Sequence, residues 1–196
     1  MKKIFPALMI LALAASAHAA PRSVDVTAFD VAGVKLGMTP EDAKAALKAS
    51  FGVDDEAIVD DKFPGKDSVT GEKIPSYFSV KSGNHSLLIH HVTNLRDGKQ
   101  PARAVTRIEY EMPYTEENVV AMREAALGKY GENANSPNTL PMHWCEHPHE
   151  NTGIGCDRHD EPRLELAQTR IVLEDPRYRQ AIIDWQEKQQ SEKPKF

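Results

Sequence analysis

The first nineteen residues constrain this chain more than any other stretch of its sequence. Two lysines follow the initial methionine, an uncharged and mostly apolar run extends from Ile4 to Ala17, and the stretch closes on Ala17-His18-Ala19. A basic start, a short apolar run and a small-x-small close are the pattern of a cleaved secretory signal peptide, and the run is too short to span a membrane. We therefore expect residues 1–19 to be removed, the mature chain to begin at Ala20, and the protein to fold in the bacterial periplasm.

That compartment decides the chemistry of the two cysteines, Cys145 and Cys156. An oxidising environment favours a disulfide, and two cysteines leave a single connectivity within the chain. The alternative is an activated thiol, since His143 and His147 flank Cys145 and an imidazole can lower the pKa of a thiol. Because a second cysteine is present to form the bond, the sequence favours a Cys145–Cys156 disulfide over a reactive centre.

Charge and hydropathy limit the partners of the mature chain. The formal net charge is −5 at pH 7, and a mildly acidic protein has little electrostatic attraction to nucleic acid or anionic lipid. No apolar run after the leader approaches the ~20 residues that cross a bilayer, and no cysteine stands directly after the cleavage site, where a lipid would be attached. We therefore expect no nucleic-acid partner, no transmembrane span in the mature chain and no lipid anchor.

Capping residues and apolar periodicity predict the secondary structure. Three segments begin with a capping side chain followed by proline or acidic residues and carry an apolar stripe, which predicts helices at 39–51, 115–130 and 176–189. Alternation of apolar and polar residues predicts a three-stranded antiparallel meander at 76–81, 86–93 and 104–112. Shorter strands are predicted at 24–29, 142–146 and 154–157, and one long strand at 163–173 with a bulge near 167–169. The polar stretch 53–73 is interpreted as a long connection.

These elements predict an α+β fold in which helices cover an antiparallel sheet. We expect one domain over residues 20–190 and a frayed tail at 191–196. The first two helices share a threonine cap, an acidic first turn and an aromatic-glycine end. The spans 33–112 and 113–189 are therefore candidate halves of a degenerate helix-plus-sheet repeat, and ordinary capping chemistry occurring twice is the alternative.

The segment from Gly33 to Ala43 reads Gly-Val-Lys-Leu-Gly-Met-Thr-Pro-Glu-Asp-Ala. It resembles the opening of the β-lactamase-inhibitor-like fold, which is shared with the SmpA/OmlA outer-membrane assembly lipoproteins. In that fold a Gly-Met-Thr-x-Glu turn leads into a helix that packs on an antiparallel sheet. The resemblance implies a non-enzymatic binding or assembly role and transfers no binding residue. The chain departs from the lipoproteins because it lacks a lipidation cysteine.

Histidines gather around the two cysteines and form the strongest local motif. Imidazole and carboxylate side chains are ligands of zinc and copper, and the candidates are His143, His147, His149 and His159. A disulfide would consume both thiolates, and no established zinc spacing is present. A periplasmic metal-binding protein that uses this cluster is therefore the alternative function, and we expect no other cofactor.

No other pattern predicts catalysis, so we expect a protein that is not an enzyme. The carboxylate pairs 54–55 and 60–61 lie in a polar stretch, where they are expected to be solvated rather than to form an acid–base pair. His90 and His91 should face opposite sides of a strand, one buried and one exposed. Among the tryptophans, Trp144 is expected to pack on the disulfide and Trp185 to seat the last helix on the sheet.

The leading hypothesis is a secreted, non-catalytic binding or envelope-assembly protein. It would present the uncovered face of its sheet, or the 53–73 segment, to an envelope protein partner. Arg107, Glu109 and Glu111 alternate along the clearest predicted strand and would line such a face. An ordinary solvated sheet surface is the alternative reading of the same residues.

Overall fold

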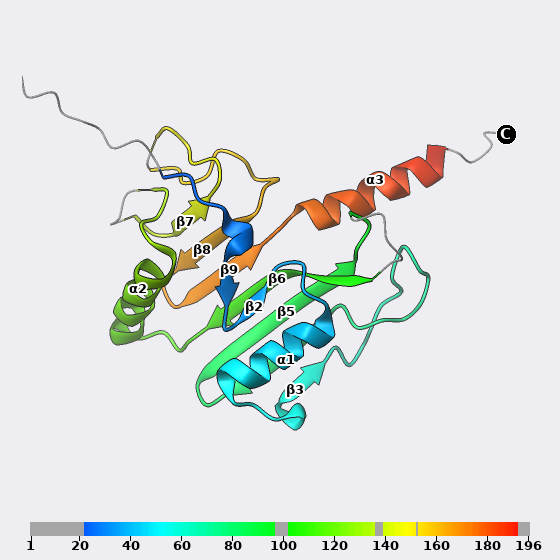
Figure 1. Cartoon of the computed structure of the whole chain (residues 1–196), viewed down its shortest axis with the longest axis horizontal. Helices are drawn as coiled ribbons and strands as arrows, with labels where there is room; N and C mark the ends of the chain where they lie inside the picture. The colour runs from blue at the N-terminus through cyan, green and yellow to red at the C-terminus, as the bar shows by residue number, and fades with distance from the viewer. Residues whose placement is uncertain (1–21, 97–101, 136–138, 152, 192–196) are drawn as a thin grey trace, which may run out of the picture.

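Seven antiparallel strands form the main sheet in this computed structural model, which describes residues 22–96, 102–135, 139–151 and 153–191 (Figure 1). The predicted leader, residues 1–19, and the tail residues 192–196 lie outside that part. In spatial order the strands are β3 (Ile58–Asp60), β4 (Tyr77–Ser82), β5 (His85–Thr93), β6 (Arg103–Glu111), β9 (Arg170–Glu174), β8 (Arg163–Ala167) and β7 (Met142–Cys145). A two-stranded sheet pairs β1 (Asp30–Val31) with β2 (Val34–Lys35).

Three α-helices accompany the sheet: α1 (Pro40–Phe51), α2 (Glu116–Tyr130) and α3 (Arg177–Ser191). The caps that the sequence predicted are present. Thr39 accepts a hydrogen bond from the Asp42 backbone N–H, and Thr115 accepts one from that of Asn118. Each bond satisfies an N–H group that has no partner within its helix. The α+β fold and its three helices are thus confirmed, with boundaries shifted by one or two residues.

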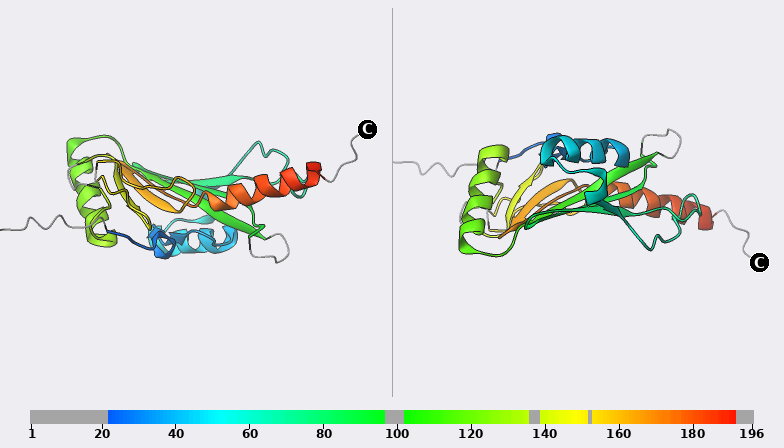
Figure 2. Two further views of the ribbon diagram at one scale, coloured as in Figure 1. Left: turned by 90° about the horizontal axis from the view of Figure 1, so that it is seen from above. Right: turned by 90° about the horizontal axis from the view of Figure 1, so that it is seen from below.

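The main core lies between the sheet and the two helices α1 and α2. Figure 2 shows the sheet edge-on, with α1 against one of its faces. Side chains from six strands and α1 are fully buried there: Phe78, Ile89, Ile108, Trp144, Leu164, Leu173 and Leu47. The meander β4–β5–β6 has the predicted pairing, with Ile89 opposite Ile108 in the middle of the sheet. The burial of these alternating residues on one face leaves the other face polar.

The predicted strand at 163–173 is wrong, because the chain reverses within it. β8 and β9 form a tight hairpin in which Ala167 pairs with Arg170. Gln168 occupies the left-handed region with φ of 57°, which the turn of such a hairpin requires. The change of apolar phase that suggested a bulge therefore marks a turn between two strands.

Three further predictions need correction. The stretch 24–29 is not a strand; it contains a 3₁₀-helix, η1 (Val26–Ala28), capped by Asp25. The stretch 154–157 contributes only an isolated bridge between Pro148 and Cys156. The polar connection at 53–73 is mostly irregular as predicted, but it contains a second 3₁₀-helix, η2 (Asp55–Ala57), and the edge strand β3, which the sequence did not predict.

The last helix, α3, begins at the end of β9 and projects away from the body of the protein (Figure 1). Tyr178 is its buried residue, and Trp185 is only half-buried and outside the core. The expectation that Trp185 seats the last helix on the sheet stays a prediction, and much of the helix extends beyond the sheet (Figure 1). No helix among the described residues is long and apolar enough to cross a membrane.

Candidate functional site

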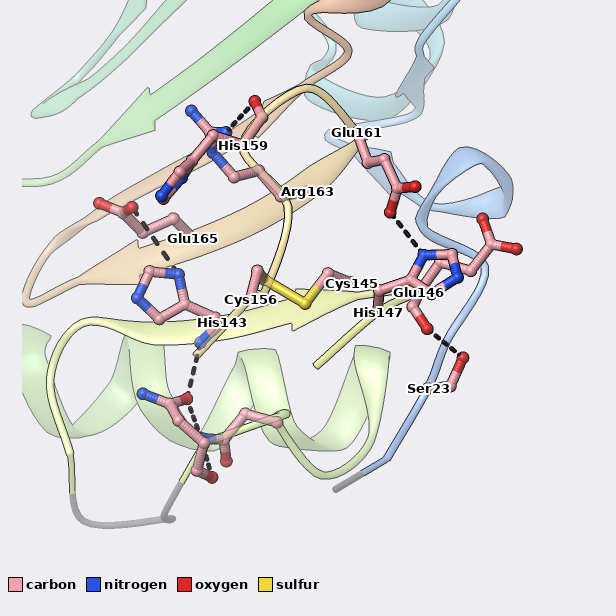
Figure 3. The surroundings of a disulfide bond; sticks show 12 residues. Ser23, His143, Cys145, Glu146, His147, Cys156, His159, Glu161, Arg163 and Glu165 are labelled. Atoms are coloured by element: carbon pink, nitrogen blue, oxygen red, sulfur yellow. Dashed lines mark hydrogen bonds and ion pairs between the residues drawn. A yellow bond between two sulfur atoms is a disulfide. The ribbon is translucent and has the colours of Figure 1, made fainter. Parts of the chain in front are cut away.

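The predicted disulfide joins Cys145 at the end of β7 to Cys156, with Cα atoms 6.0 Å apart (Figure 3). Both cysteines are buried, and with Ala134 they form a small cluster separate from the main core. Trp144 precedes Cys145 on the strand and so points to the opposite face. Its ring packs in the main core and its Nε1 donates a hydrogen bond to the carbonyl of Gly131. The prediction that Trp144 packs on the disulfide is therefore wrong.

The structure disperses the four histidines that the sequence proposed as metal ligands. Figure 3 shows His143 and His147 on either side of the disulfide. Each histidine has its own contact: His143 Nδ1 lies 3.8 Å from Glu165 Oε2, His147 Nδ1 lies 2.6 Å from Glu161 Oε2, His149 Nε2 lies 3.9 Å from Asp157 Oδ1, and the carbonyl of His159 accepts a hydrogen bond from Arg163. The described part of the chain contains no group of three or more metal-ligating side chains, so these histidines form no common site there.

The sheet face opposite the main core carries a network of charges, which we call the arginine face: Arg107, Glu109, Arg163, Arg170 and Glu174. Antiparallel pairing places Arg107 opposite Glu174 and Glu109 opposite Val172, and Arg163 pairs with Glu174 from the other side. Arg107 Nε donates to Glu109 Oε1 at 2.6 Å, and Arg170 Nε donates to Glu109 Oε2 at 3.1 Å. Arg107 and Arg163 both contact Glu174. Each carboxylate thus binds two guanidinium groups.

On the arginine face, Glu109 and Glu174 are more buried than the arginines that bind them. The side chains of Glu109 and Glu174 are 16% and 15% exposed, whereas those of the three arginines are 25–43% exposed. Burial alone would raise the pKa of Glu109, but hydrogen bonds from Arg170 and Arg107 hold that pKa below its ordinary value. Glu109 is therefore recessed and ionised, and the three guanidinium groups, together with the more exposed carboxylate of Glu165, surround a hollow of about 140 Å³ over Val172.

A second charged site lies where α3 begins, and we call it the α3 cleft. It has a volume of about 480 Å³ and is lined by Asp25, Thr27, Leu36, Arg96, Glu146, Asp175, Arg177 and Tyr178. Asp175, only 4% exposed, lies at its base. Arg96 Nη1 donates to Asp175 Oδ2 at 2.8 Å, and Arg177 binds the same carboxylate through Nε and Nη2. Arg96 also lies over the ring of Tyr178, with Cζ 4.6 Å from the ring centre.

The two histidines of β5 differ as predicted. His91 is 4% exposed, and its Nδ1 accepts a hydrogen bond from Arg103 Nε at 2.8 Å. Two causes lower the pKa of His91 to about 4: burial, which is the larger, and the nearby positive charge of Arg103. His90 faces the other side of the sheet, where its partly exposed ring lies 3.8 Å from Glu109. His91 is therefore a neutral structural group, and His90 borders the arginine face.

No family model, curated protein or solved structure matches this chain. The resemblance of Gly33–Ala43 to the β-lactamase-inhibitor-like fold stays a prediction. The candidate sites are therefore defined by geometry and charge alone.

Sequence reasoning found part of these sites and missed the rest. Arg107 and Glu109 were predicted on the polar face of β6, and the structure adds Arg163, Arg170 and Glu174 from the β8–β9 hairpin. The third residue predicted for the face, Glu111, is exposed at the end of β6. The α3 cleft was not predicted, because its residues come from five separate stretches of sequence. The one local signal was Asp175, which the sequence predicted as the cap of the last helix. It does cap the helix, because its Oδ1 accepts a hydrogen bond from the backbone N–H of Arg177.

Proposed function

We propose that this chain is an exported, non-catalytic binding protein whose arginine face engages an acidic segment of a protein partner in the periplasm. The observation that carries the proposal is that Glu109 and Glu174 are less exposed than the three guanidinium groups they bind. Each arginine is held in place by a recessed glutamate and still directs further N–H donors outward.

A partner with carboxylates would gain from this arrangement in two ways. Charge-assisted hydrogen bonds between arginine and carboxylate are among the stronger polar contacts, and arginine is enriched at protein interfaces. The ion pairs with Glu109 and Glu174 hold the guanidinium groups in position before binding, so less conformational freedom is lost on association.

Two further observations favour binding over catalysis. The thiol of Cys145, which the sequence offered as a nucleophile, is bonded to Cys156. The hollow of the arginine face has a volume of only about 140 Å³ and a mostly charged lining, whereas sites for small substrates are usually larger and mostly apolar. The short resemblance to assembly lipoproteins implies the same class of function.

The direct test measures binding of a fluorescently labelled hexaglutamate peptide to the oxidised mature chain, by anisotropy at 50 mM and 500 mM salt. We expect binding at low salt that weakens at high salt, because exposed charges are screened, and no binding of a hexalysine peptide. R170Q should weaken binding at least tenfold. Glu109 keeps Arg107 as a partner in that variant, so the fold should be retained.

The matched control is R158Q. Arg158 is an exposed arginine that pairs with Glu161, and Glu161 keeps His147 as a second partner when Arg158 is replaced. Equal binding of hexaglutamate by wild type, R170Q and R158Q would contradict the proposal, and so would the absence of any binding at 100 μM protein. Fractionation of cells that express the full chain tests export, and we expect the shortened form in the periplasmic fraction.

A further inference from the structure

Two arginines, Arg96 and Arg177, contribute positive charge to the lining of the α3 cleft. The carboxylate of Asp175 accepts four hydrogen bonds, from the backbone N–H, Nε and Nη2 of Arg177 and from Nη1 of Arg96. One carboxylate therefore binds two guanidinium groups, and the group of three keeps a net positive charge. A guanidinium has five N–H donors, so most donors of Arg96 remain available beyond this contact.

Two acidic side chains line the same cleft. Asp25 lines it from the segment before η1, and Glu146 lines it from the residue after β7. Oδ1 of Asp25 accepts from the backbone N–H and the hydroxyl of Thr27, which holds the side chain in place. Glu146 is exposed. The hydrogen bond from Arg177 to Asp175 is the main cause that raises the pKa of Arg177, and the negative charge of Glu146 adds to this rise. Side chains of both charges therefore line one cavity.

The cleft also has apolar lining. Leu36 and the ring of Tyr178 contribute apolar surface to it. The ring of Tyr178 also stacks against Arg96, with Cζ 4.6 Å from its centre, and a stacked guanidinium is held more rigidly than a free one. A volume of about 480 Å³ is within the range of small-molecule sites and above the size of one amino acid.

We propose that the α3 cleft binds a small zwitterion, with the ligand carboxylate on Arg96 and Arg177 and the ligand ammonium group on Asp25 and Glu146. A simple anion would be attracted by the two arginines and repelled by the two acids, whereas a simple cation would be attracted by the acids and repelled by the arginines. A molecule that carries both charges can pair with both sets of side chains. Free amino acids and short peptides have this chemistry.

The experiment titrates the oxidised mature chain with L-alanine and with L-alanyl-L-alanine in a calorimeter. Two capped compounds separate the charges: N-acetyl-L-alanine keeps only the carboxylate, and L-alanine amide keeps only the ammonium group. We expect at least one of the two zwitterions to bind, and each capped compound to bind at least tenfold more weakly. Tighter binding of L-alanine identifies a free amino acid as the ligand, and tighter binding of the dipeptide identifies a short peptide.

Variants locate the site. R96Q leaves the two-point contact between Arg177 and Asp175 in place, so it should lower zwitterion affinity at least tenfold without unfolding the chain. E146Q should weaken the zwitterions and leave N-acetyl-L-alanine unchanged or bound more tightly. R170Q, on the arginine face, is the control and should leave this binding unchanged. The proposal is overturned if neither zwitterion binds at 10 mM, if N-acetyl-L-alanine binds as well as the zwitterions, or if R96Q and R170Q have the same affinity.

Discussion

Nε of Arg103 donates a hydrogen bond to Nδ1 of His91, and this contact requires a neutral imidazole. The same guanidinium reaches Asp67 through Nη1 at 3.1 Å and the carbonyl of Pro75 through Nη2 at 2.9 Å. Asp67 also accepts from the hydroxyl of Thr93 at 2.7 Å. The protonation state of His91 is therefore coupled to the contacts that tie the 61–76 segment to β5 and β6.

Stability should fall as the pH drops from about 6.5 toward 4. An unfolded histidine titrates near pH 6.5, whereas burial, followed by the charge of Arg103, lowers the pKa of folded His91 to about 4. Between these values the unfolded state binds more protons, so each step to lower pH favours unfolding. We expect the free energy of unfolding in urea to decrease by about 1–2 kcal/mol from pH 7 to pH 5 through this group.

The control for this prediction is H91Q. A glutamine oxygen can accept the hydrogen bond from Arg103 and does not titrate, so the decrease between pH 7 and pH 5 should become smaller. A residual slope is expected, because burial also lowers the pKa values of His90 and His143. The same slope in H91Q and wild type would show that His91 is not the titrating group.

Removing the disulfide should destabilise the chain by about 3 kcal/mol on the chain-entropy model, because the bond closes a loop between residues eleven apart in sequence. The double variant C145A/C156A and the reduced wild type should unfold at similar, lower urea concentrations. Equilibrium unfolding of the oxidised protein gives the reference. An unchanged midpoint on reduction would mean that the loop is held by its other contacts, such as the bridge between Pro148 and Cys156.

The sequence predicted the features that depend on neighbouring residues and missed those that depend on distant ones. The cap of Thr39 and the glycine end of α1 at Gly52 follow from local chemistry, and both are present. The turn at Gln168 was missed because no glycine, proline, asparagine or aspartate marks it. The projection of α3 away from the body of the protein was missed because periodicity gives the apolar side of a helix and not whether a sheet lies against it.

Gly155 tests the packing of the disulfide loop. Its φ of 93° is in the left-handed region, and a Cβ placed there would lie 2.5 Å from Cδ2 of His143. G155A therefore combines backbone strain with a clash, and we expect a loss of about 2–4 kcal/mol in the free energy of unfolding.

The matched control is G71A. Gly71 has a φ of 76°, and no atom lies within 4 Å of the position that a Cβ would take there, so this variant reports strain alone, about 1 kcal/mol. The double variant G155A/H143A should regain the free energy of unfolding that G155A loses beyond the loss in G71A, because the clash with the His143 ring is removed. If G155A and G71A lose the same stability in urea unfolding, the ring of His143 is not pressed against the loop.

Glu174 should be the glutamate of the arginine face on which the hairpin depends most. Its recessed carboxylate binds Arg107 on β6 and Arg163 on β8, so E174Q removes the counter-charge of the half-buried Arg163 and leaves Arg107 with Glu109 alone. We expect a loss of about 1–3 kcal/mol, since an uncompensated buried donor costs more than a mean hydrogen bond gains. E165Q is the control, because Glu165 lies on the same face of β8, is 38% exposed and contacts only His143 at 3.8 Å; its cost should stay below about 0.5 kcal/mol. Urea unfolding of both variants at 50 mM and 500 mM salt measures the difference. Equal stability of E174Q and E165Q at low salt would show that the network contributes no more than ordinary surface ion pairs.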